Sequence, residues 1–265
     1  MSAAVGREGR GDHISPQIYA RTGGLLYLII IIIGALGEAV VRGGLIVSGD
    51  PAATAEKIRS SEFLWRTGIA GELLLLVCAV ALTMIFYVLL RPVNRVLALL
   101  AVFFNLVSIA VEADSALHLV ATLFPLGNTN SLKVLDPNQL HAMAYFSIRS
   151  HENGFGVALI FFGCVCLVDG YLIFRSGYLP RVIGVLMQIA GLCYLTNSFA
   201  LILSPSLAQR LFPAILLPAF VGEASLCLWL LVKGVNLERW NERAGLASES
   251  LTPATSSGSR KGASE

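Results

Sequence analysis

The chain has 265 residues, of which 55% are hydrophobic and only 14% are charged, and its mean hydropathy is +0.73. An ordinary soluble domain carries about 25% charged residues, so the composition excludes that class and indicates a polytopic membrane protein. The net charge of +2, without a basic patch that has aromatic residues interleaved, also argues against a nucleic-acid partner.

Six predominantly apolar stretches follow one another along the chain, and each has the roughly 20 residues that cross a hydrocarbon core of about 30 Å. In chain order they cover residues 22–42, 66–90, 95–122, 154–174, 181–203 and 211–233. We therefore predict an all-α polytopic bundle of six transmembrane spans within a membrane domain over residues 19–235. Residues 1–18 are expected to be a disordered tail, and residues 236–265 a largely disordered one.

The distribution of Lys and Arg predicts the orientation. The two tails and two tight hairpins, one holding Arg91 and Arg95 and the other Arg175 and Arg181, contain 12 of the 19 basic residues. The positive-inside rule then places both termini in the cytoplasm. We expect a multi-pass protein of a plasma membrane. All five cysteines lie inside the predicted spans, so no disulfide framework is expected.

Two loops on the predicted outer side carry a helix-start signature, Asp50-Pro51 and Asp136-Pro137, with Asp as N-cap and Pro at the first helical position. They predict two short interfacial helices, and we expect the second, over residues 137–148, to act as a lid. The two starts are 86 residues apart, and the same offset relates Gly68 to Gly154 and Arg95 to Arg181. This predicts a parallel repeat of residues 50–112 and 136–198.

Glycine recurs at every seventh position on the fourth span, at Gly156, Gly163 and Gly170. Small residues at this spacing form a stripe along one side of a helix and allow a neighbouring helix to approach closely. We therefore predict that a second span packs tightly along this stripe.

Carboxylates inside the spans are the feature that bears most on function. A charged side chain in the bilayer costs roughly 2–3 kcal/mol even on insertion scales, so it usually faces a partner, water or a site. We predict a ligand or proton site in the outer half of the bundle from polar residues inside the spans: Glu72, Glu112, Glu223, Asn105, Asp114, His118 and Asn197. Charged and polar residues near the outer ends of the spans are predicted to form its rim: Glu38, Arg42, Arg66, His151, Glu152 and Asn153.

Some of these residues also have a structural interpretation. Arg42 follows Glu38 by four residues, which is the spacing of an ion pair within one helix. His118 and His151 are possible metal ligands, but no HxxxH, HExxH or ExxH spacing supports them, so neither a metal nor another cofactor is expected. The chain also lacks a Gly-rich phosphate loop and a GxSxG elbow.

The segment SHENGFGVALIFFG and its continuation GYLIFRSGYLPRVIGVLMQIAGLCYLTNSF, within residues 150–199, resemble the bacterial membrane proteins of the domain-of-unknown-function 4386 family. DPAATAEKIRSSEFLWRTGIAGELL, residues 50–74, is similar to the first outer loop and second span of that family. The resemblance extends over roughly residues 18–235 and implies a multi-span integral membrane protein. It implies no activity for any residue.

The polar residues inside the spans favour binding or transport of a small or lipid-like ligand through an outward-facing intramembrane pocket. A second hypothesis is a membrane-embedded enzyme in which a carboxylic acid protonates a lipid or an isoprenoid. A third is a structural or partner-binding membrane protein. The expected partners are the lipid bilayer and a small hydrophobic or ionic ligand, and assembly into a homo-oligomer stays open.

Overall fold

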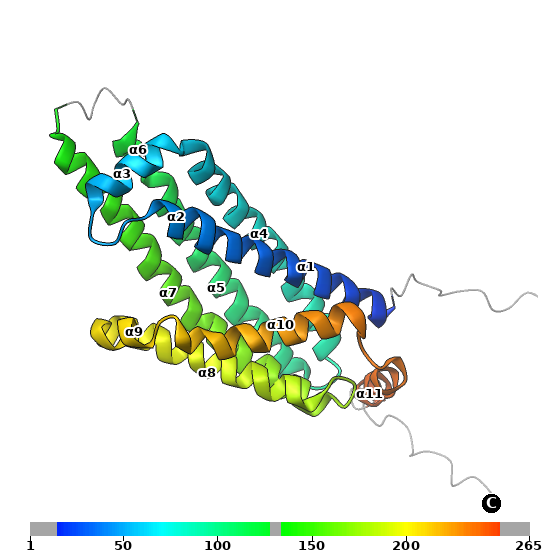
Figure 1. Cartoon of the computed structure of the whole chain (residues 1–265). Helices are drawn as coiled ribbons and strands as arrows, with labels where there is room; N and C mark the ends of the chain where they lie inside the picture. Colours follow the sequence, from blue (N-terminus) through cyan, green and yellow to red (C-terminus); the bar gives the residue numbers. More distant parts are fainter. Residues whose placement is uncertain (1–14, 128–133, 250–265) are drawn as a thin grey trace, which may run out of the picture.

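The computed structural model describes residues 15–127 and 134–249, and within these residues the chain is helical and contains no strand (Figure 1). The elements are, in order, α1 Pro16–Leu36, the π-helical turn η1 Gly37–Arg42, α2 Gly43–Leu45, α3 Pro51–Ser60, α4 Glu62–Leu90, α5 Arg95–Ala121, α6 Leu123–Leu126, α7 Pro137–Ser176, α8 Arg181–Leu203, α9 Pro205–Leu211, the 3-10 turn η3 Ala214–Leu216, α10 Leu217–Val232 and α11 Leu237–Glu249.

Within residues 15–127 and 134–249, six helical runs are long and apolar enough to cross a membrane, which confirms the six predicted spans. They are Pro16–Leu45, Glu62–Leu90, Arg95–Leu126, Pro137–Ser176, Arg181–Leu203 and Ala214–Val232. The protein is therefore a multi-pass membrane protein built as a helical bundle. We call the end of the bundle that carries α3 and α6 the α3 end, and the opposite end, where α11 lies, the α11 end (Figure 1).

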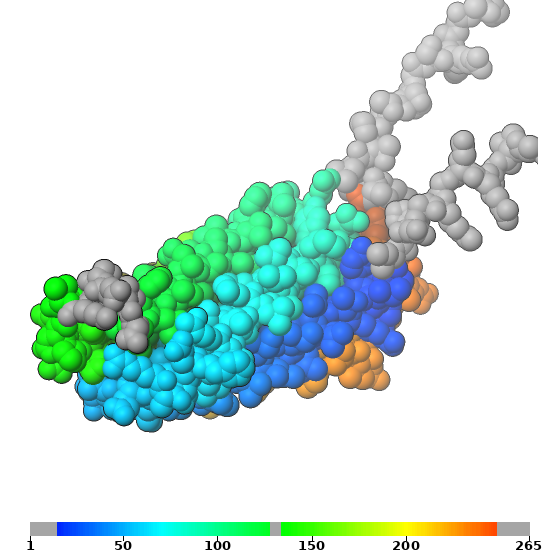
Figure 2. Space-filling view, turned by 90° about the horizontal axis from the view of Figure 1, so that it is seen from above, coloured from blue at the N-terminus to red at the C-terminus, as the bar shows by residue number. Residues whose placement is uncertain are grey.

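Each span packs against the span that follows it in the chain, and the last span, α10, also packs against the first, α1. Figure 2 shows one face of this arrangement, with α1, α4 and α5 side by side. Most of the buried core lies toward the α11 end, where α1, α4, α7, α8 and α10 all contribute to one apolar cluster.

The helix α7 is longer than the sequence predicts. Residues 137–148, expected as a separate lid helix, are instead the first turns of α7, which continues without a break to Ser176. At about 1.5 Å per residue its 40 residues measure about 60 Å, twice the hydrocarbon thickness. The other outer helix, α3, is separate from α4 as predicted. Both predicted caps are present, at Asp50 and Asp136.

Close packing of α7 on α8 uses glycines from both helices. A Cβ at Gly170 would lie 2.7 Å from the carbonyl oxygen of Gly184, and a Cβ at Gly191 would lie 2.6 Å from the carbonyl oxygen of Gly163. Distances this short leave no room for a side chain because the neighbouring atoms are backbone. The glycine stripe on α7 therefore has a matching pair of glycines on α8, and the two backbones touch.

The C-terminal segment is more ordered than the sequence predicts. Residues 237–249, expected within a largely disordered tail, form α11 across one end of the bundle (Figure 1). The indole Nε1 of Trp240 donates to the Leu89 carbonyl at 3.1 Å, and Arg239 Nη1 donates to the Gly177 carbonyl at 3.1 Å. These bonds fix α11 to both hairpins at this end. Residues 1–14, which make up most of the predicted N-terminal tail, and residues 250–265 lie outside the described residues.

Replacing Gly184 by Ala tests the contact between α7 and α8. The added Cβ would lie 2.6 Å from the Gly170 carbonyl oxygen, so we expect a loss of about 1–3 kcal/mol of stability, as for other overpacked sites. Thermal unfolding of the purified protein in detergent measures this loss. The control is Gly44→Ala, where nothing lies within 4 Å of the new Cβ. Equal melting temperatures for the two variants would contradict the contact.

Candidate functional site

A π-helical turn, η1, follows α1 near the α3 end of the first span. Its closing hydrogen bond runs from the Gly43 amide to the Glu38 carbonyl, five residues back instead of four. Glycine and β-branched residues in this stretch weaken the preference for a regular α-helix. Single π-helical turns inside α-helices occur frequently at functional sites. This turn carries two charged side chains, Glu38 and Arg42.

The guanidinium of Arg42 bridges two carboxylates from different helices. Its Nε donates to Oε2 of Glu38 at 2.7 Å, and its Nη1 donates to Oε2 of Glu72 on α4 at 3.0 Å. The side chain of Glu38 is 63% exposed, whereas that of Glu72 is only 9% exposed. The second oxygen of Glu72, Oε1, is buried and accepts no hydrogen bond from any described residue. It is an acceptor without a donor.

Direct contact between η1 and α4 places Arg42 beside Glu72. A Cβ at Gly68 would lie 2.7 Å from Cγ1 of Val41, so glycine at this position lets Val41 pack against α4. Glu72 lies about one turn further along α4 than Gly68, and Arg42 follows Val41 directly. The same approach of the two helices therefore brings the guanidinium to the carboxylate.

Glu112 reaches the same level through the pairing of α4 with α5. The indole Nε1 of Trp65 donates to the Leu119 carbonyl at 3.2 Å, which fixes the two antiparallel helices against each other. Glu72 is seven residues after Trp65, and Glu112 is seven residues before Leu119. Both carboxylates therefore lie about two turns from the same contact. They are close enough to interact electrostatically.

A further contact joins α5 to α7 beside these carboxylates. The hydroxyl of Ser115 donates to the His151 carbonyl at 2.7 Å, and Nδ1 of His151 lies 3.2 Å from the Ser115 carbonyl. The same Nδ1 is 3.8 Å from Oε1 of Glu72, beyond hydrogen-bond range. The imidazole is buried. The imidazole therefore lies beside Oε1 of Glu72 without donating a hydrogen bond to it.

We call these residues the Arg42 cluster: Glu38, Arg42, Glu72, Glu112, Ser115 and His151. Glu152, which pairs with Arg149, interacts electrostatically with Glu38 and Arg42 and forms the edge of the cluster. Four spans thus contribute to one group of charges. Two of its three carboxyl groups, those of Glu38 and Glu72, bind the one guanidinium.

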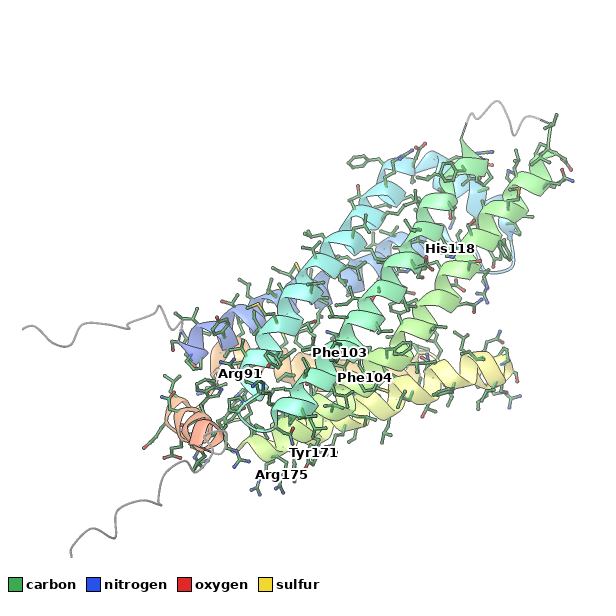
Figure 3. All side chains as sticks on the ribbon, turned by 180° about the vertical axis from the view of Figure 1, so that it is seen from behind. Arg91, Phe103, Phe104, His118, Tyr171 and Arg175 are labelled. Atoms are coloured by element: carbon green, nitrogen blue, oxygen red, sulfur yellow. The ribbon has the colours of Figure 1, made fainter. Side chains whose placement is uncertain are left out.

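Several residues predicted for the site or its rim lie apart from the Arg42 cluster. Asp114 is exposed and His118 partly exposed on α5, and Figure 3 shows His118 toward the α3 end. Asn153 is exposed on α7, and Asn197 is partly exposed on α8. Among the described residues, no hydrogen bond or ion pair joins any of these four side chains to Glu72.

Two further predicted residues have other partners. Asn105 donates to Oγ1 of Thr83 at 2.6 Å and so links α5 to α4 nearer the α11 end. Arg66 pairs with Glu62 one turn earlier on α4 at 2.7 Å, and both side chains are more than half exposed. The first contact is a structural link between two spans, and the second is an ordinary surface ion pair.

Glu223 has its own partners, and we call this group the Glu223 triad. The hydroxyl of Tyr194 on α8 donates to Oε1 of Glu223 on α10, and Tyr27 on α1 lies close enough to this carboxyl group to interact with it. Phe162 meets the Tyr194 ring edge-on, with ring centroids 5.5 Å apart, and Phe86 meets the Tyr27 ring at 6.1 Å. The triad thus packs against the apolar core, with Tyr27 buried and with Tyr194 and Glu223 partly buried, and it is separate from the Arg42 cluster.

The two groups lie at different depths. Arg91 and Arg175 mark the α11 end (Figure 3). Glu72 is 19 residues from Arg91 along α4, about 28 Å, whereas Glu223 is 10 residues from Lys233 along α10, about 15 Å. With a hydrocarbon core of about 30 Å, the Arg42 cluster lies near one boundary and the Glu223 triad near the middle. The glutamates predicted to form one site in the outer half of the bundle therefore lie in two groups at different depths.

An apolar groove of about 660 Å³ lies at the α3 end, beyond the Arg42 cluster. It is lined by residues from α5, α6 and the first turns of α7: Ala121, Phe124, Pro125, Ala142, Met143, Phe146 and Ser147. No carboxyl group or imidazole lines it. Its walls can therefore provide apolar contact and no proton transfer.

Metal binding finds no support in the described part of the chain, where no group of three or more His, Cys, Asp or Glu side chains is placed to hold an ion.

The prediction from sequence also missed three partners, Thr83, Tyr27 and Tyr194. Nothing in their sequence spacing marks them, because each meets its carboxyl or amide partner only through packing between different helices.

Arg42→Gln tests whether the guanidinium organises the cluster. Removing it leaves the largely buried Glu72 without its counter-charge, which for a buried pair costs about 3–5 kcal/mol. The matched control is Arg66→Gln, which breaks an exposed pair with the same four-residue spacing and should change stability by less than about 1 kcal/mol. Thermal unfolding in detergent compares the two. A loss for Arg42→Gln no larger than the control would contradict this role.

Comparison with known proteins agrees with this architecture. An uncharacterised protein from Archaeoglobus fulgidus is 25% identical over 169 residues, which cover 64% of this chain and 85% of the relative. No solved structure matches the chain. A family model described as a domain of unknown function, DUF4386, matches residues 22–234, which is nearly all of the six-span bundle. The chain belongs to the DUF4386 family.

Proposed function

We propose that this membrane protein binds and transports a small or lipid-like ligand that carries an ammonium group, and that the Arg42 cluster is its binding site. One observation carries this proposal: Oε1 of Glu72 is buried and has no donor among the described residues, although Arg42 holds the other oxygen of the same carboxylate. A buried acceptor left without a donor costs about 1–3 kcal/mol. A ligand that donates to it recovers that energy.

The charges of the cluster favour a cation as the ligand. Glu38, Glu72 and Glu112 supply three carboxyl groups, and Arg42 supplies one positive charge that is paired with the first two and interacts electrostatically with the third. An ammonium group adds a second positive charge and offers three N–H donors. A carboxylate or phosphate ligand would instead add negative charge beside Glu72.

The position of the cluster suits a ligand that enters from water or from the edge of the bilayer. The helix rise places Glu72 near the hydrocarbon boundary, and the Glu38 side chain is mostly exposed there. A charged headgroup is stable at that depth, whereas its apolar part can lie in lipid. The apolar groove beyond the cluster provides further contact for such a part.

We further propose that the α11 end faces the cytoplasm of the cell and that the Arg42 cluster faces outward. The hairpins at the α11 end carry Arg91 and Arg175 (Figure 3), and α11 adds Arg239 and Arg243. An excess of Lys and Arg in short connections at one end is typical of the cytoplasmic side. By this proposal the protein lies in a plasma membrane with both termini inside.

The enzyme hypothesis has less support. It requires a carboxylic acid in contact with an apolar substrate, and no carboxyl group lines the apolar groove. The structural hypothesis requires only that charges hold helices together, and it leaves the free oxygen of Glu72 unexplained. The ligand-binding proposal explains that oxygen by giving it a donor.

Methylammonium tests the proposed ligand class. We expect it to raise the melting temperature of the wild-type protein above the value in tetramethylammonium at equal concentration, because only methylammonium has N–H donors. Glu72→Gln should weaken methylammonium binding at least about tenfold, the equivalent of about 1.4 kcal/mol. Thermal unfolding in detergent and flux of radiolabelled methylammonium into proteoliposomes measure the two effects.

The matched control for this experiment is Glu62→Gln, an exposed carboxylate on the same helix that should leave both effects unchanged. Equal stabilisation by the two cations would exclude a site that recognises N–H donors. Methylammonium binding that survives in folded Glu72→Gln would exclude this carboxylate as the ligand contact. Loss of stability in Glu72→Gln with no methylammonium effect in the wild type would support the structural hypothesis.

Fusion of reporters to the C-terminus tests the orientation. Green fluorescent protein placed there should fluoresce, and alkaline phosphatase placed there should be inactive, because the first folds in the cytoplasm and the second only outside it. The opposite pattern would reverse the proposed orientation and place the Arg42 cluster on the cytoplasmic side.

A further inference from the structure

We infer that the Glu223 triad is a proton-binding site in the middle of the membrane, distinct from the Arg42 cluster. Its ligand is a proton exchanged with water, which converts the carboxylate of Glu223 to a carboxylic acid. Tyr27 on α1 and Tyr194 on α8 are its positioning residues. The inference is independent of the ligand proposed for the Arg42 cluster.

Apolar side chains surround the triad. Tyr27 belongs to a buried cluster with residues of all five other spans, and Tyr194, Phe86 and Phe162 pack against that cluster. The titratable side chains that face Glu223 are Tyr27 from α1, Cys166 from α7 and Tyr194 from α8. Among the described residues, Glu223 forms no ion pair with Lys, Arg or His. An ionised carboxylate in this place therefore lacks a balancing charge.

The two tyrosines satisfy the carboxyl group in either protonation state. A phenol hydroxyl both donates and accepts hydrogen bonds, so the tyrosines can donate to a carboxylate or one of them can accept from a carboxylic acid. Only hydroxyl hydrogens need to rotate. The guanidinium of Arg42 differs, because it has donors alone and cannot accept a hydrogen bond from a carboxylic acid. The triad can therefore exchange a proton without moving heavy atoms.

The Glu223 triad, where this proton exchange is proposed, lies far from the Arg42 cluster. Tyr27 and Glu38 are 11 residues apart on the first span, which at about 1.5 Å per residue is about 16 Å. No direct hydrogen bond spans such a distance. The triad therefore titrates as a site of its own, and a change at Glu72 should leave it intact.

Infrared spectroscopy of the purified protein in lipid vesicles tests the inference directly. The carbonyl stretch of a protonated carboxylic acid is recorded from about pH 4 to about pH 10, the range over which buried carboxyl groups titrate. We expect a titrating carboxylic band in the wild type, shifted in deuterated water. The difference spectrum between the wild type and Glu223→Gln isolates this band from those of other buried carboxyl groups such as Asp169, and Tyr194→Phe should shift its frequency without removing it. Glu72→Gln should leave it unchanged.

Three outcomes would overturn the inference: a wild type with no titrating carboxylic band, the same band in folded Glu223→Gln, or a Tyr194→Phe spectrum identical to that of the wild type. Thermal unfolding establishes that each variant is folded. Should Glu223→Gln not fold, Tyr27→Phe together with Tyr194→Phe decides the result, because both leave the carboxyl group in place and remove only its partners. Unchanged band frequencies in both would contradict the triad.

Discussion

A charge placed near hydrocarbon must find its partner within the protein, and this constraint shapes the first half of the bundle. Arg42 meets it by binding Glu38 in its own turn and Glu72 on the next span. To do so, the chain forms a π-helical turn and places Gly68 opposite Val41. The first two spans are thereby joined by charge as well as by apolar contact. One oxygen of Glu72 remains free at their junction.

The site follows from the register of neighbouring helices. A hydrogen bond from Trp65 fixes α4 against α5, and the Ser115 hydroxyl fixes α5 against α7. Each of these two hydrogen bonds lies about a whole number of helical turns from a carboxylate. The acidic side chains of different spans therefore lie at the same depth in the bundle. The same regularity leaves Glu223 elsewhere, since α10 packs against α1 and α8 and not against α4. Two polar groups at two depths are the result.

The sequence predicts the fold well because apolar length alone identifies spans, and it also predicts the ion pair of Glu38 with Arg42 from their spacing. It does not predict that α7 continues through residues 137–148, since a helix lying on the membrane and one rising from it share the same periodicity. The sequence also does not predict that Tyr27 and Tyr194 are the partners of Glu223. They meet Glu223 only because three distant helices converge, and no local spacing encodes that convergence.

A double-mutant cycle on Arg42 and Glu72 measures the interaction on which the proposed site depends. If the guanidinium and the carboxylate hold each other near the membrane boundary, removing both charges by Arg42→Gln and Glu72→Gln should destabilise the protein less than Arg42→Gln alone. The coupling energy should then exceed about 1 kcal/mol. Losses that add to within about 0.5 kcal/mol would show that the two side chains act independently, and would contradict a binding site organised by Arg42.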